Sequence, residues 1–278
     1  MLRLWLAAFA CLCLGHFCTD VVAQEFRVYN RLLDFSDVSQ ENGPTVVART
    51  TTIWHAGKVY DVIYLTGEVT ILEPAQRQIW VLNDSKNLRT SVDFDELKHL
   101  LRDAEDRLSQ QIQELDAKSK ASQDVIESLR QQLRPKFETS FDSRQQRLIL
   151  ESQQLSYEVR GQTDVRPEAL DAYLNSADWM CRLNFVLHPQ PTLFPTARLE
   201  LNERLRQLRL MPVEVTLRTK HDRSVSLQAD HTLSWNLNAL DRQCIHKWES
   251  LLRDQKLQKV SVEEYRRTVL SQQTAKAR

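Results

Sequence analysis

The clearest alternation of apolar and polar residues runs from Pro212 to Trp235. Its odd-numbered positions carry mostly apolar side chains: Val213, Val215, Leu217 and Thr219, then Val225, Leu227, Ala229, His231, Leu233 and Trp235. A period of two residues is typical of strands with one buried face, so this stretch predicts an antiparallel hairpin. Because the apolar faces must lie together, odd positions pair with odd positions. The loop is then either 220–222 or 220–224.

The N-terminal part of the chain contains a series of strand-like segments with short connections. They are rich in Val, Ile, Thr and aromatic residues, and turn-forming pairs such as Ala56-Gly57 and Thr66-Gly67 separate them. The segments span 26–35, 46–55, 59–65, 68–72 and 78–82. Connections this short predict an antiparallel meander.

The middle strands of this meander are apolar on both faces. Val59, Ile63 and Leu65 alternate with Tyr60, Val62 and Tyr64, and Ile79 and Val81 alternate with Trp80 and Leu82. Such strands are either covered on both faces, or one face lines a cavity. Apolar strands are more often part of a filled core, so coverage is the first expectation and the cavity is the alternative.

The hydrophobic period changes from two to between three and four at Asp93. Asp93 stands three residues before Glu96, an arrangement typical of a helix N-terminus. Leucines then recur at helical spacing, stop at 118–122 and resume beyond it. One helix over 93–134 would be about 60 Å long, so two antiparallel helices broken near 117–122 are an equal alternative. In either form, the segment is a candidate surface for a protein partner.

Strands and helices follow one another in the C-terminal half. Strands are predicted over 147–151 and 155–161, and helices over 167–187, 196–209, about 238–251 and from 262 onward. Pro167 suits a helix start, and Ser261 and Glu264 form a capping box. The buried stripe of the helix from about 238 is expected to be Leu240, Cys244, Trp248 and Leu251. The order of elements predicts an α+β fold, an antiparallel sheet with helices packed on it, in one domain over 24–278.

Residues 1–23 have the features of an export signal. Arg3 precedes an apolar run from Leu4 to Gly15, and Ala23 is a small residue of the kind that a signal peptidase recognises before Gln24. No later stretch is apolar over the length that a bilayer requires. The sequence therefore predicts an exported protein, periplasmic or secreted, without a transmembrane anchor after cleavage.

Composition argues against several classes of function. Lys plus Arg equal Asp plus Glu at 37 each, so no overall positive field favours nucleic acid. Five glycines in the whole chain argue against a glycine-rich phosphate loop. The chain has no nucleophile elbow, zinc-protease helix, Walker loop or Cys-x-x-Cys pair. No cofactor is predicted, and an enzyme would need a site built from scattered residues.

Two cysteines, Cys181 and Cys244, remain after the signal is removed. In an oxidising compartment they could form one disulfide, worth about 2–4 kcal/mol of stability. Free cysteine is also among the residues that pack well in a core. The favoured interpretation is two buried thiols on separate helices, with the disulfide as the alternative.

Two groups of residues could form a metal-binding or ligand-binding site. Asp95, His99 and Asp103 are spaced by four on one helix and could share a divalent metal, but a solvated face with ion pairs is the expected interpretation. His231 lies on the apolar face of the C-terminal hairpin, where a core histidine with a backbone or tyrosine partner is expected and a ligand role is the alternative.

Large aromatic residues could line a pocket for an apolar ligand, although such residues more often fill cores. The candidate pocket residues are Trp54, Tyr60, Tyr64, Trp80, His231 and Trp235.

The order of strand meander, helices, strands, helices, hairpin and closing helices over 26–257 resembles that of the periplasmic lipoprotein carriers of the LolA type. The resemblance implies a strongly curved antiparallel sheet around helices, with an apolar cavity between them. It covers the order of elements and no residue motif, so it assigns no site residue. The helical segment 93–134 has no counterpart in it.

Three functions are compatible with these observations. The first is a non-catalytic binding or carrier-like module for an apolar or lipid-like ligand, held between sheet and helices. The second is a structural or interaction protein that uses the helices of 93–134. The third is a hydrolase, which would need a cleft that gathers His231 with a carboxylate and a nucleophile.

Overall fold

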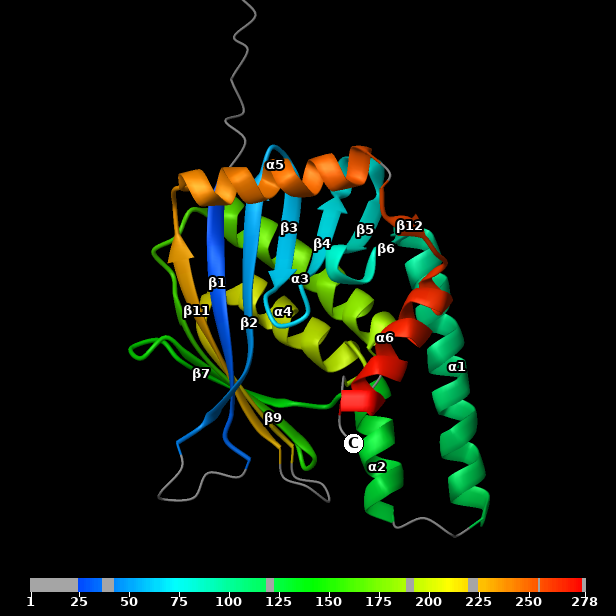
Figure 1. Cartoon of the computed structure of the whole chain (residues 1–278). Helices are drawn as coiled ribbons and strands as arrows, with labels where there is room; N and C mark the ends of the chain where they lie inside the picture. Colours follow the sequence, from blue (N-terminus) through cyan, green and yellow to red (C-terminus); the bar gives the residue numbers. More distant parts are fainter. Residues whose placement is uncertain are drawn as a thin grey trace, which may run out of the picture.

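The structure, a computed structural model, describes residues 25–36, 43–118, 123–188, 193–219, 225–254 and 256–276. The predicted export signal, 1–23, lies outside the described residues. The described residues form one curved sheet of twelve strands, and helices cover it (Figure 1). The predicted α+β class and its curved antiparallel sheet are confirmed.

The strands lie in the sheet in the order β12-β6-β5-β4-β3-β2-β1-β11-β10-β9-β8-β7, and all pairs are antiparallel except β12 with β6. Their bounds are β1 Phe26–Asp34, β2 Thr45–His55, β3 Lys58–Ile63, β4 Glu68–Glu73, β5 Gln78–Asn83, β6 Leu88–Asp93, β7 Glu138–Asp142, β8 Arg147–Glu151, β9 Leu155–Gln162, β10 Met211–Thr219, β11 Ser226–Ser234 and β12 Gln258–Lys259. The helices are α1 Phe94–Lys118, α2 Gln123–Leu133, α3 Pro167–Leu187, α4 Thr196–Leu208, α5 Ala239–Arg253 and α6 Val262–Lys276. Short 3₁₀ turns, Pro74–Gln76 and Asp84–Lys86, join β4 to β5 and β5 to β6.

The pairing of β10 with β11 confirms the predicted parity. Val215 lies opposite Ala229, so odd positions pair with odd positions. The Thr219 N–H donates to the Val225 carbonyl over 2.9 Å, which leaves 220–224 as the connection. Of the two predicted loops the longer is therefore present, although its own residues lie outside the described part.

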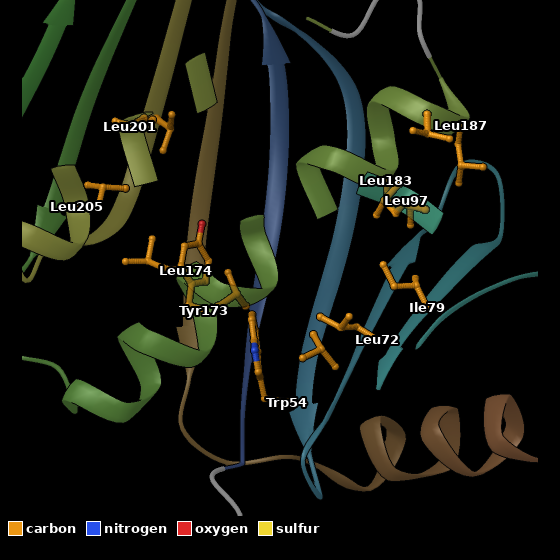
Figure 2. Close-up of a cluster of buried hydrophobic side chains, with 14 of the residues drawn as sticks. Trp54, Leu72, Ile79, Leu97, Tyr173, Leu174, Leu183, Leu187, Leu201 and Leu205 are labelled. Atoms are coloured by element: carbon orange, nitrogen blue, oxygen red, sulfur yellow. The ribbon is translucent and has the colours of Figure 1, made fainter. Parts of the chain in front are cut away.

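The inner face of the sheet, defined here as the face covered by α1, α3, α4 and α6, carries the main core. Figure 2 shows Leu183 and Leu187 of α3 near Ile79 of β5, and Leu201 and Leu205 of α4 farther along the same face. These side chains are buried, and they belong to one continuous apolar cluster. The long amphipathic α3 forms because its apolar residues recur every three or four positions.

The outer face is covered by α5, which lies across one end of β1 to β5 (Figure 1). Tyr60, Val62 and Leu82 from the sheet form a second buried cluster there with Ile245 and Trp248 from α5. The two apolar faces of the meander are therefore both covered over β4 and β5. For these strands the first expectation, that both faces are covered, is confirmed.

The buried stripe of α5 differs from the predicted one. Leu240 and Cys244 are exposed, whereas Asp241, Ile245 and Trp248 are buried. The reason is electrostatic and local. Asp241 accepts hydrogen bonds from the Asn238 backbone N–H and, over 3.0 Å, from Arg27 on β1, and these bonds turn its side of the helix toward the sheet.

The segment 93–134 forms two helices, α1 and α2, which lie antiparallel (Figure 1). Arg130 and Asp116 form an ion pair of 2.9 Å between them. Asp93 caps α1 by accepting hydrogen bonds from the backbone N–H groups of Asp95 and Glu96, as its spacing predicts.

Three strands were not predicted from the sequence. Strand β6 follows the 3₁₀ turn and has a weak alternation of Leu88, Thr90 and Val92 on its inner face. Strand β7 is a mostly exposed edge strand, and β12 is only two residues long. Among the described residues, no helix combines the length and the apolarity needed to cross a bilayer.

Candidate functional site

A cavity of about 330 Å³ interrupts the packing of the inner face, between β1, β2, β3 and β11 on one side and α3 and α4 on the other. It communicates with solvent. Sites for small molecules typically have volumes of roughly 300–1,000 Å³ and combine apolar walls with a few polar groups. This cavity has the dimensions of a small-ligand site.

The sheet wall of the cavity follows from strand alternation. Thr50, Thr52 and Trp54 of β2 face the cavity with Asp61 and Ile63 of β3, because side chains two apart share a face. Strands β1 and β11 add Asn30, Leu32, Ala229 and His231.

The helix wall combines one stripe of α3 with one residue of α4. The α3 residues recur every three or four positions: Tyr173, Ser176, Ala177, Met180, Cys181 and Asn184. Arg198, in the first turn of α4, completes this wall.

Asp61 is a carboxyl group held deep in the sheet wall. It is the cross-strand neighbour of Thr52, whose hydroxyl donates to it over 2.5 Å. Among the described residues it has no cationic partner within 4 Å. Burial raises the pKa of Asp61 to about 6, the Thr52 hydrogen bond opposes the rise, and the charge of Glu68 adds to it. At neutral pH the cavity therefore contains a largely ionised, unpaired acid.

Arg198 is the corresponding cation on the helix wall. Its Nε donates to Asn202 Oδ1 over 3.0 Å, and its guanidinium borders the Tyr173 hydroxyl. No carboxylate lies within 4 Å of it in the described part of the chain. The side chain lies deep in the protein and keeps accessible surface where it borders the cavity. An unpaired buried charge is costly unless another group compensates it.

His231 and Tyr173 connect the two walls. The Tyr173 hydroxyl lies 3.0 Å from His231 Nε2, which is the tyrosine partner expected for a core histidine. Burial, and secondly the Arg198 charge, lowers the pKa of His231 to about 4. Burial raises the pKa of Tyr173. Both side chains are therefore neutral at neutral pH, and Arg198 is the one cation of the described cavity wall.

Among the described residues, the cavity does not pair its serine or its cysteine with a base. It contains His231, Asp61, Ser176 and Cys181, but Ser176 and Cys181 each donate to a carbonyl of their own helix. Burial raises the pKa of the Cys181 thiol to about 11, so it is protonated at neutral pH. No hydrogen bond joins His231 to either group among the described residues.

Of the six residues predicted to line a ligand pocket, the structure brings two together. Trp54 stacks on Phe26 at a centroid distance of 4.1 Å, donates from Nε1 to the Ala172 carbonyl and borders the cavity. In Figure 2 its ring is next to that of Tyr173. His231 is the second residue.

The other four lie elsewhere. Tyr60 and Trp80 point to the outer face, because they alternate with the inner residues of β3 and β5, and they pack under α5. Tyr64 is an exposed turn residue. Trp235 is partly exposed beyond the end of β11, where the Arg166 guanidinium lies over its ring.

The predicted metal alternative on α1 is not formed. Asp95 pairs with Arg77 at 2.8 Å, and His99 lies 3.8 Å from Asp103 as an i,i+4 pair. No cluster of three or more potential metal ligands occurs in the part of the chain that the structure describes. The expected solvated face with ion pairs is present instead.

The two cysteines are free thiols on opposite faces of the sheet, Cys181 on α3 and Cys244 on α5. The sheet separates them, so the disulfide alternative is wrong for this structure. The expectation of two buried thiols is also wrong for Cys244, which is exposed.

A larger crevice of about 490 Å³ lies between α1 and α2. Charged and amide side chains make up most of its wall, including Glu105, Arg130 and Arg134. No large apolar side chain of α1 or α2 is exposed among the described residues, because Ile112, Ile126 and their neighbours face inward. The described residues of α1 and α2 thus present no large apolar patch of the kind that marks many protein interfaces.

The two charged cavity residues were not identified from the sequence, although each left a signal. Asp61 stands between Val59 and Ile63 on a strand face that is otherwise apolar. Arg198 precedes Leu201 and Leu205 by helical spacing on the buried side of α4. A charge at such a position indicates either a buried partner or a functional cavity.

Comparison of the sequence with known protein families finds no match, and no curated protein is significantly similar to it.

Proposed function

We propose that this protein is a non-catalytic binding or carrier-like module that holds a small, largely apolar ligand in the inner-face cavity. One observation carries the proposal. The inner face is filled by side chains along most of its length, but a space of about 330 Å³ remains between β1–β3, β11 and helices α3 and α4. The space is open to solvent, and an apolar ligand in it would replace water with contacts to the cavity wall.

The chemistry of the wall supports binding rather than turnover. Trp54, Ile63 and Met180 provide apolar surface, and Ser176 and Cys181 donate to carbonyls of their own helix rather than to a base. The proposed relation to LolA-type carriers rests on the order of elements and on a curved sheet over helices. We include an exported location in the proposal, on the composition of residues 1–23.

Two measurements test this function. Native mass spectrometry of the protein, purified from cells that export it, should show a co-purifying adduct with the mass of a small lipid. Independently, phenylnaphthylamine, an uncharged apolar fluorophore, should bind with increased fluorescence.

A cavity-filling variant locates the binding. Ala177→Leu adds a side chain inside the cavity and should weaken fluorophore binding at least about tenfold, because it occupies ligand space. Ala75→Leu, at an exposed turn, is the matched control and should bind as wild type. No adduct together with no fluorophore binding would contradict the function, and equal binding by Ala177→Leu would place the ligand elsewhere.

A further inference from the structure

The cavity contains two opposite charges that the protein leaves unpaired. Arg198 is on the helix wall and Asp61 on the sheet wall, and no oppositely charged group lies within 4 Å of either among the described residues. Several other charges below the surface have partners within the protein. Arg27 binds Asp241 at 3.0 Å, for example. The cavity is thus the place where an external group could compensate a charge.

The surroundings of Arg198 favour an anionic partner. Its Nε donates to Asn202 and its guanidinium also interacts with the Tyr173 hydroxyl, so the remaining terminal N–H groups are the donors left for a ligand. A guanidinium binds carboxylate, phosphate or sulfate oxygens with two parallel hydrogen bonds, and such charge-assisted bonds gain strength away from bulk water. Neutral His231 and Tyr173 add no competing anion at this wall.

We propose that the ligand of this cavity is an amphiphile whose anionic head group pairs with Arg198 while its apolar part lies against Trp54, Ile63 and Met180. This inference rests on the proposed function and names the ligand class. Asp61 repels the same head group from the sheet wall, which orients the ligand with its head toward α4.

The test is a series of ligands with the same decyl chain and different head charges, titrated calorimetrically into the full chain below their micelle concentrations. Decyl sulfate should bind at least about tenfold more tightly than decanol, and decyltrimethylammonium should bind most weakly, because only the sulfate can accept charge-assisted hydrogen bonds from Arg198. Inorganic sulfate without a chain should bind far more weakly than decyl sulfate.

Two variants locate the charge effect. Arg198→Gln should weaken decyl sulfate binding about 10- to 100-fold and leave decanol binding nearly unchanged. Arg204→Gln, on the same helix but paired with Glu200 at the surface, is the matched control. Asp61→Asn should strengthen decyl sulfate binding severalfold, since it removes the repelling charge.

The outcomes separate the two proposals. If decyl sulfate and decanol bind equally, the anionic head is refuted and the binding function stands. If no decyl compound binds, both fail. If inorganic sulfate binds as tightly as decyl sulfate, the ligand is a free anion and the amphiphile is refuted. Should Arg198→Gln not fold, the charge series on wild-type protein still decides the question.

Discussion

The effect of Asp61 on stability at different pH values tests whether the cavity wall is poorly solvated. The substitution Asp61→Asn keeps the size of the side chain and an oxygen that can accept the Thr52 hydroxyl, but it removes the charge. Burial raises the pKa of Asp61 from an ordinary value of 3.8 to about 6. Each pKa unit corresponds to about 1.4 kcal/mol, so ionising Asp61 costs the folded state about 3 kcal/mol.

The sign of the pH dependence follows from the raised pKa. Between about pH 4 and pH 6, the folded protein binds more protons at Asp61 than the unfolded chain does. The contribution of Asp61 to stability therefore falls as the pH rises through this window and levels off above it. The penalty is about 1 kcal/mol at pH 4.5 and about 3 kcal/mol at pH 7.5. Asp61→Asn should thus gain about 2 kcal/mol more stability relative to wild type at pH 7.5 than at pH 4.5.

Urea unfolding followed by tryptophan fluorescence at both pH values measures this difference. Comparing variant with wild type at each pH cancels the titration of all other groups. Asp95→Asn is a control with a pKa shift of opposite sign, because the hydrogen bond from Arg77 lowers the pKa of that exposed carboxyl. That contribution to stability is lost only below the ordinary pKa of 3.8, so the stability loss of Asp95→Asn should be nearly equal at the two pH values. A pH-independent effect of Asp61→Asn would refute the reasoning and indicate that water in the cavity solvates the charge fully.

Three further results are expected. Gly161→Ala should cost about 1–3 kcal/mol of unfolding free energy, because its Cβ would lie 2.5 Å from a neighbouring leucine side chain. Gly43→Ala, which has open space around the added methyl group, should be near neutral, and chemical denaturation measures both variants. Trp248→Ala should lower the stability by about 3–5 kcal/mol, since this side chain anchors α5 to the outer face, and a loss below about 1 kcal/mol would contradict that packing. Iodoacetamide should modify exposed Cys244 rapidly and Cys181 slowly, because burial raises the pKa of Cys181 to about 11. Bound ligand should slow the modification of Cys181 further. Equal modification rates of the two cysteines, measured by mass spectrometry, would argue against the position of Cys181 in the cavity wall.

Local sequence determined much of this protein. Strand alternation set which residues of the β10–β11 hairpin face inward, since a shift of one residue would turn the whole apolar set toward water. Capping residues such as Asp93 and Asn238 set where helices begin, because they bond to backbone groups within a few positions. The same alternation on β3 and β5 predicted two apolar faces, each of which a helix layer then covers.

The tertiary structure alone decided where those faces close completely and where they leave a space. Trp54 and Tyr60 are equally aromatic strand residues, yet one borders the cavity and the other packs under α5. Asp61 and Arg198 belong to distant elements, and they border the same cavity only because α3 and α4 pack on the inner face beside β3. Local periodicity encodes which side of an element is buried. What lies opposite that side, and whether the contact is filled, depends on long-range packing that no short stretch of the sequence contains.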